Sequence, residues 1–173
     1  MKKLLRYGIF FTLIMVVGFM IVSSFIQLKD KRRIENQIES IPDFAFKSID
    51  DDVFISNQGI KNNLPTLILY FNTECEHCLY EAEQISKNHD KFSASQVLMV
   101  SFENIDTLKH FAMEYGFYNQ ENISVLQDSK FQFDSIFGRS PVPSSFIYDI
   151  NGKLVKKFNG EVKIETLLKY LGK

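Results

Sequence analysis

Cysteine and histidine are scarce in this 173-residue chain, and tryptophan is absent altogether. There are two cysteines and three histidines, and only His77 lies beside a cysteine. A structural zinc site normally takes four ligands, often from two cysteine pairs, so this composition disfavours zinc. No cysteine stands near the N-terminus, which excludes a lipid-modified N-terminal cysteine.

An excess of positive charge is also missing, since the formal net charge is −1. That value hides an asymmetry, because residues 1–33 carry +6 and residues 34–173 carry −7. An acidic domain gives no reason to expect nucleic-acid binding. The sequence has no internal repeat and no low-complexity tract, and its length predicts one ordinary domain.

The two cysteines that are present form a C-x-x-C motif, Cys75-Glu76-His77-Cys78. The motif follows the apolar, β-prone run 67–71 and opens a segment with apolar residues at helical spacing. A strand that delivers C-x-x-C to a helix start is typical of a redox dithiol, because the helix N-terminus favours a thiolate. A structural disulfide is the alternative, but it would close a very small loop and stabilise the fold little. The motif therefore predicts a dithiol that cycles between thiol and disulfide.

A long uncharged run covers residues 7–28, and its 22 residues suit a helix that crosses a bilayer. The competing interpretation is a cleaved signal peptide with its cleavage site near residues 22–24. We favour an uncleaved anchor, residues 1–28, because the run is long for a signal peptide. Basic residues flank both ends, so the positive-inside rule is nearly balanced. Since an N-terminal apolar segment usually exports such a domain, we expect residues 29–173 outside the bacterial cell membrane, facing the periplasm or the cell exterior.

The remaining chain divides into a charged linker, residues 29–40, and a domain, residues 41–173. Hydrophobic periodicity and turn residues predict the order β-α-β-α-β-α-β-β-α after an N-terminal hairpin, which is an α/β layered fold. The predicted elements are a hairpin over 44–55 with a turn at Asp50–Asp52, strands at 67–71, 96–102, 123–126, 144–149 and 154–158, and helices at 75–88, 105–115, 131–137 and 162–171.

Three stretches of the domain match a known family pattern. They are Ile41-Pro42-Asp43-Phe44, the C-x-x-C with Glu81 behind it, and Val142-Pro143-Ser144-Ser145-Phe146 ahead of the turn at Asn151-Gly152. Together they resemble the thioredoxin fold and, more narrowly, the TlpA/ResA-type membrane-anchored thiol-disulfide oxidoreductases. The resemblance covers residues 41–173. It implies a thioredoxin-like central mixed sheet flanked by helices, with an N-terminal hairpin and a strand-helix insertion at 96–115.

The resemblance also implies an activity and a set of roles. The reaction would be dithiol–disulfide exchange with thiol- or disulfide-bearing proteins, without a cofactor, and a membrane redox protein would donate or accept the electrons. Cys75 is the predicted nucleophile and Cys78 the predicted resolving thiol. Pro143 is the predicted cis-proline, and the backbone of Val142 would pair with an extended substrate segment.

Four charged side chains are predicted to tune the dithiol. A protonated His77 would favour the thiolate of the first cysteine, whereas Glu74 and Glu76 would disfavour it, which favours the reducing direction. Glu81 lies one helical turn beyond the second cysteine, and the resemblance implies a buried carboxyl that tunes the pair. The alternatives are an exposed helix residue for His77 and a solvated surface residue for Glu81.

Departures from the family pattern keep other functions open. Thioredoxins usually carry Trp where this chain has Glu74 and Pro where it has His77, and His at that place resembles the oxidising DsbA type. A membrane-tethered, non-catalytic binding module is another alternative, but retention of both cysteines argues against it. A peroxiredoxin-like peroxidase does not fit P-x-x-x-T-x-x-C, because Thr73 stands two residues before Cys75 and the proline is missing.

Overall fold

The computed structural model describes residues 2–51, 53–61 and 63–172, with side chains described from residue 15 onward. The chain divides into two compact units, Met1–Asn36 and Gln37–Lys173. The described residues of the first unit lie in helix α1, Lys2–Gln37, so the charged segment continues the helix from residue 29 to residue 37. The side chains of residues 7–14, the first part of the predicted anchor, lie outside the described residues.

Membrane spanning was predicted for residues 7–28, and their described part is rich in exposed apolar side chains such as Phe19 and Phe25. Within the described part of the chain, no helix combines the length and the apolar character required to cross a membrane. The anchor therefore stays a prediction.

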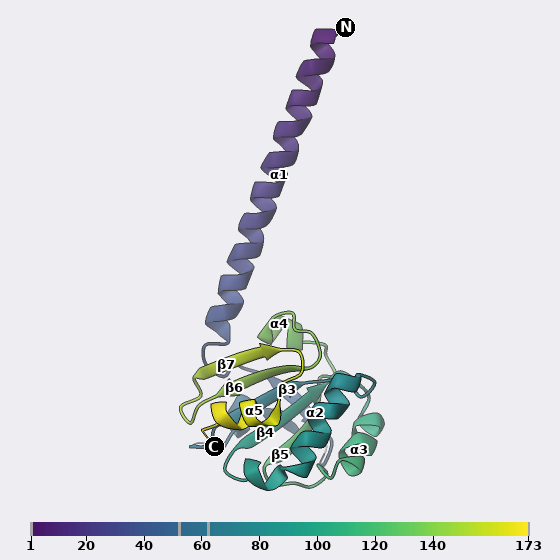
Figure 1. The fold of residues 1–173 in the computed structure, drawn as a ribbon, viewed down its shortest axis with the longest axis vertical. Coiled ribbons are helices and arrows are strands. Elements are labelled where there is room, and N and C mark those ends of the chain that lie inside the picture. The colour runs from purple at the N-terminus through teal and green to yellow at the C-terminus, as the bar shows by residue number, and fades with distance from the viewer. Residues whose placement is uncertain (1, 52, 62, 173) are drawn as a thin grey trace. The chain divides into compact units, whose positions relative to one another are not determined.

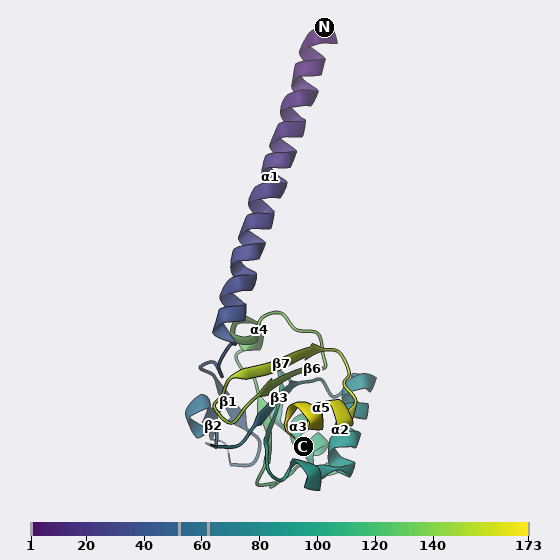
Figure 2. The same cartoon turned by 60° about the vertical axis from the view of Figure 1, so that its left-hand side comes forward.

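The second unit is built on one seven-stranded sheet in the order β2-β1-β5-β4-β3-β6-β7 (Figure 1 labels β3 to β7, and Figure 2 labels β1 and β2). Strands β3, β4 and β5 are parallel, whereas β1, β2, β6 and β7 join by antiparallel pairing, so the predicted mixed sheet is confirmed. The strands are β1 Ala45–Ser48, β2 Phe54–Ser56, β3 Thr66–Tyr70, β4 Gln96–Ser101, β5 Ile123–Gln127, β6 Ser144–Tyr148 and β7 Leu154–Asn159.

The helices follow the predicted order. They are α2 Glu76–Lys87, α3 Ile105–Glu114, α4 Phe133–Phe137 and α5 Ile164–Tyr170, with short 3-10 turns η1 Asn57–Gly59 and η2 His89–Phe92. The strand and helix predicted at 96–115 are β4 and α3, and β4 lies beside β3 in the middle of the sheet. Of the predicted turn at Asp50–Asp52, Asp52 lies outside the described residues.

Two helix starts were predicted two residues too early. Phe131 has a φ of 52°, which is left-handed backbone, so α4 begins only at Phe133. Its start is fixed by the buried carboxylate of Asp128, which accepts hydrogen bonds from the backbone N–H groups of Gln132 and Phe133 at 3.0 and 2.8 Å. Helix α5 likewise begins at Ile164 rather than at residue 162.

Alternating side chains of β3 pack into two apolar layers, one on each face of the sheet. Leu67 and Leu69 belong to the core cluster shared with buried residues of α2, α3 and α5, which cover one face of the sheet (Figure 2). On the other face Tyr70 stacks on Phe133 of α4, with ring centroids 4.0 Å apart. Phe46 is buried and joins the same aromatic layer. Both layers pack against β3, and the residues that follow β3 carry the dithiol.

Candidate redox site

The dithiol sits where β3 passes into α2. Cys75 is the N-cap of α2, with extended backbone at φ −89° and ψ 112°, and its carbonyl accepts a hydrogen bond from the N–H of Leu79 at 3.0 Å. Asn72 shapes the loop before it. Its backbone carbonyl accepts from the N–H of Cys75 at 3.3 Å, and its side chain accepts from the N–H of Glu74 at 2.7 Å. The predicted placement of C-x-x-C at a helix start is therefore confirmed.

The two thiols differ in their surroundings, and both are free. Cys75 is partly exposed, whereas Cys78 is only 1% exposed. Burial and a hydrogen bond with Cys75 raise the pKa of the Cys78 thiol well above its usual value, against the opposite effect of a backbone hydrogen bond from Asn72. Cys75 is thus the accessible sulfur, and Cys78 holds its proton at neutral pH.

A proline loop faces the first cysteine. The Val142–Pro143 peptide bond is cis, as predicted. The thiol of Cys75 donates to the carbonyl oxygen of Val142 at 3.7 Å, a length typical of a weak sulfur hydrogen bond. Pro143 is buried, and its carbonyl accepts from the N–H of Gly160 at 2.8 Å. The loop therefore presents the half-buried Val142 backbone directly beside the accessible sulfur.

Glu81 is buried beneath the dithiol, with 1% of its surface exposed, so it is not a solvated surface residue. One carboxyl oxygen accepts a hydrogen bond from the hydroxyl of Ser145 on β6 at 3.3 Å. The other carboxyl oxygen has no hydrogen-bond partner among the residues that the structure describes. The pKa of Glu81 is raised to about 8, chiefly by burial; the hydrogen bond from Ser145 opposes the rise, and the negative charge of Glu161 adds to it.

The other predicted tuning residues, Glu74, Glu76 and His77, are exposed. The imidazole Nδ1 of His77 lies 2.7 Å from the carboxylate of Glu161, in the loop between β7 and α5. The roles of these three residues in tuning the thiols stay predictions. Glu161 was not found from the sequence, because it stands 84 residues from His77 and belongs to no motif.

Glu103 is a second residue that the sequence did not reveal. Its carboxylate accepts hydrogen bonds from the hydroxyl of Thr73 at 2.6 Å and from the backbone N–H of Thr73 at 2.9 Å. The hydroxyl of Ser101 adds a third bond at 3.0 Å. Glu103 thus ties the loop before Cys75 to the end of β4. The only signal in the sequence was a polar residue directly after a buried strand.

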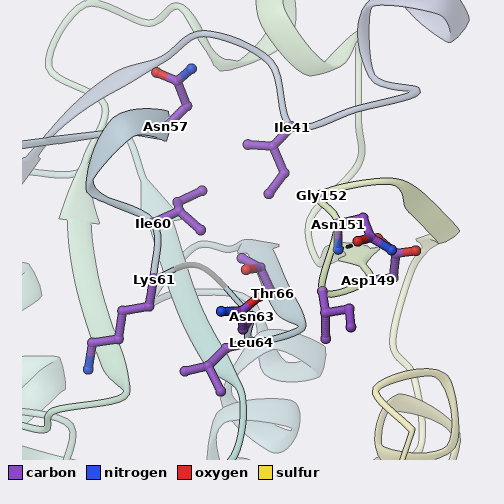
Figure 3. A pocket seen from close by; sticks show the side chains of 11 residues that line it. Ile41, Asn57, Ile60, Lys61, Asn63, Leu64, Thr66, Asp149, Asn151 and Gly152 are labelled. Atoms are coloured by element: carbon purple, nitrogen blue, oxygen red, sulfur yellow. Dashed lines mark hydrogen bonds between the residues drawn. The ribbon is translucent and has the colours of Figure 1, made fainter.

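A cavity of about 540 Å³ lies at the other end of β3 (Figure 3). It lies between Ile41, Leu64 and the turn at Asp149–Gly152, and Thr66, the first residue of β3, lines it. Cys75 follows the last residue of β3, so this cavity is separated from the dithiol by the length of the strand. It is lined by neither cysteine and contributes nothing to the redox site.

A C-x-x-C at a helix start, packed against a cis-proline loop on this mixed sheet, defines a thioredoxin-like thiol-disulfide oxidoreductase. The chain belongs to the AhpC/TSA family, which matches residues 39–157. The peroxidase pattern is still unmet in this member, since Thr73 stands two residues before Cys75.

Similar proteins agree with this class. "Thiol-disulfide oxidoreductase ResA" of Bacillus anthracis is 26% identical over 179 residues, which cover 100% of this chain and 98% of that protein. The crystal structure of StoA from Bacillus subtilis matches with a TM-score of 0.60 and 18% identity, over 76% of this chain and 98% of that one. The crystal structure of a secreted Mycobacterium tuberculosis disulfide oxidoreductase homologous to E. coli DsbE matches with a TM-score of 0.64 and 13% identity. The match covers 79% of this chain and 97% of that one. The resemblance to ResA-type proteins is therefore confirmed, and the two structures support the fold.

Proposed function

We propose that this protein reduces disulfide bonds of other proteins in the cell envelope, with Cys75 as the attacking thiol and Cys78 as the resolving thiol. The observation that carries this proposal is the asymmetry of the pair. One sulfur is accessible beside the Val142 backbone, and the other is buried beside a carboxyl group. A nucleophile must reach its substrate, whereas a resolving thiol has to reach only the first sulfur.

The reaction proceeds in two displacements. The Cys75 thiolate attacks a substrate disulfide, forms a mixed disulfide and releases one substrate sulfur as a thiolate. The Cys78 thiol then passes its proton to the carboxylate of Glu81, and its sulfur attacks Cys75 Sγ. A Cys75–Cys78 disulfide forms, and the second substrate sulfur leaves as a thiolate. The substrate gains two electrons, and the protein dithiol loses them.

The charges around the dithiol support the reducing direction. A strong oxidant stabilises its reduced form, most often through a thiolate held by nearby positive charge. Here the exposed cation candidate, His77, is paired with Glu161, and a buried carboxyl lies beside Cys78. Neither arrangement stabilises a thiolate, so the reduced form gives up its electrons readily.

The partners follow from the same site. An extended segment of a substrate protein would pair with the backbone at Val142 in the manner of strand addition. Electrons would be returned by a membrane redox protein that reduces the Cys75–Cys78 disulfide. Residues 7–28 would anchor the chain in the bilayer and leave residues 29–173 outside the cytoplasmic membrane.

The deciding test is the reduction potential of the purified full-length protein, measured in graded thiol–disulfide buffers. We expect a value near about −250 mV or lower, as in reductases, against about −120 mV for DsbA-type oxidants. A value at the oxidising end would reverse the proposed direction. If no reversible dithiol couple is found, the catalytic proposal fails and a binding module takes its place.

A trapping experiment separates the roles of the two sulfurs. The Cys78→Ser variant should accumulate a mixed disulfide with a protein substrate, because the resolving thiol is missing. The matched Cys75→Ser variant should trap nothing, because its remaining thiol is buried. Equal trapping by both variants would contradict the assignment.

A further inference from the structure

His77 and Glu81 occupy one face of α2, because they are four residues apart. They differ sharply in exposure, since the side chain of His77 is 73% exposed and Glu81 is 1% exposed. Glu161 reaches this face from the β7–α5 loop. Its carboxylate contacts His77 at 2.7 Å, and its side chain is 33% exposed. Glu161 therefore contacts the exposed end of the helix face that also carries the buried Glu81.

Few polar or charged groups face Glu81. Cys78 faces it from α2, Ser145 from β6 and Glu161 from the β7–α5 loop. Helix α5 turns the apolar residues Ile164, Leu167 and Leu168 to the core, while Glu165 and Lys169 on the same helix are exposed. Among the described residues, Glu161 is thus the charged side chain that raises the pKa of Glu81.

We propose that Glu161, held by His77, is a positioning residue that controls whether the buried carboxyl of Glu81 carries a proton, and so when Cys78 can release its own. This inference rests on the proposed exchange reaction. In that reaction Glu81 must be ionised to accept the Cys78 proton before the mixed disulfide is resolved.

The control acts through charge. The negative charge of Glu161 adds to the burial of Glu81 in favouring the protonated carboxyl. The imidazole of His77 donates a hydrogen bond to the Glu161 carboxylate at 2.7 Å, and this bond weakens the effect of the Glu161 charge on Glu81. The exposed imidazole therefore opposes the effect of Glu161 on a carboxyl that water does not reach.

The test is a ¹³C NMR titration of the Glu81 side chain in the reduced full-length protein. In Glu161→Gln the pKa of Glu81 should fall by roughly half a pH unit or more, because a like charge is removed. In His77→Gln it should stay the same or rise, because only a neutralising partner is lost. The matched control Glu165→Gln removes an exposed carboxylate from α5 and should leave Glu81 unchanged.

The opposite pKa changes expected for the Glu161 and His77 variants distinguish an effect of charge on Glu81 from an effect of loosened packing. Entry of water around a disturbed loop would lower the pKa of Glu81 in both the Glu161 and the His77 variants, and that result would overturn the inference. An unchanged Glu81 titration in Glu161→Gln would overturn it as well.

A kinetic readout links the titration to resolution. With glutathione placed on Cys75 as a mixed disulfide, its release by Cys78 should follow the ionisation of Glu81, and the profile of Glu161→Gln should move to lower pH. If the Glu81 titration moves in Glu161→Gln but the pH profile of glutathione release does not, the link to Cys78 is overturned. Absence of any release would count against the exchange reaction itself, while the NMR titration would still test the role of Glu161.

Discussion

Glu81 brings a carboxyl group to a place that water does not reach, so its ionisation is linked to the stability of the fold. The folded-state pKa is raised from 4.5 to about 8, which means that the native protein holds a proton that the unfolded chain releases. The contribution of Glu81 to the free energy of unfolding is fully present below about pH 4.5 and is lost as the pH rises through about 8.

We therefore predict that the free energy of unfolding declines between pH 5 and pH 8, by up to about 1.4 kcal/mol for each pH unit that separates the two pKa values. Glu81→Gln should remove this decline, because its amide does not titrate, and the variant should be more stable than the native protein at pH 9. Urea denaturation at pH 5 and pH 9 measures both. A native protein equally stable at the two pH values would contradict the raised pKa.

Tyr148 carries a second buried polar group, a hydroxyl that takes no part in the redox site. Its hydroxyl has no hydrogen-bond partner among the described residues, and its ring is fully buried. Tyr148→Phe should leave stability unchanged or raise it by up to about 1 kcal/mol, because no hydrogen bond is lost. Thermal denaturation of the variant beside the native protein tests this. A clear loss of stability would show that the hydroxyl is satisfied in solution.

At the scale of elements, the loop between β3 and α2 depends on a carboxylate from the end of β4. Glu103→Ala removes the hydrogen bonds to Thr73 and Ser101, and should slow disulfide exchange by roughly tenfold, because Cys75 is no longer held in place. The rate of alkylation of Cys75 and the kcat/KM for exchange measure the effect. Glu103→Gln keeps one carbonyl oxygen that can accept a hydrogen bond from the loop. Its kcat/KM should lie between those of the native protein and of Glu103→Ala. An unchanged kcat/KM in Glu103→Ala would remove Glu103 from the positioning of the site.

Helix α4 is only five residues long and depends on its aromatic residues for its place on the sheet. Phe133 stacks on Tyr70 and contacts Phe46, Phe137 and Phe146. Phe133→Ala should cost about 3–5 kcal/mol in the free energy of unfolding, because it leaves a cavity in a packed layer. Urea denaturation of the variant and the native protein measures this loss in the free energy of unfolding. A cost below about 1 kcal/mol would show that the neighbouring rings collapse into the space.

Elements with strong local signals were predictable from the sequence, whereas contacts between distant elements were not. The C-x-x-C at the start of α2 follows from a short motif, and the cis bond before Pro143 follows from the family resemblance. Phe131 interrupts its helix through a left-handed φ, which apolar periodicity does not reveal. The pair between His77 and Glu161 joins positions 84 residues apart and depends on how β7 leads into α5.

For the whole molecule, the division after Asn36 predicts separable behaviour of the two units. The full chain should be recovered with the membrane fraction. A truncated chain of residues 37–173 should be recovered in solution with the same reduction potential. Fractionation and thiol–disulfide equilibration of the two forms test this. Recovery of the full chain in the soluble fraction would contradict the proposed anchor.

The weak hydrogen bond from Cys75 to the carbonyl of Val142 has a consequence for substrate selection. A polypeptide that adds as a strand offers a backbone N–H to that same oxygen and competes with the thiol for it. Docking then frees the sulfur at the moment when a disulfide arrives beside it. A small disulfide without an extended backbone offers no such competitor, so we expect the proposed exchange to favour protein disulfides over small-molecule disulfides before any sulfur reacts.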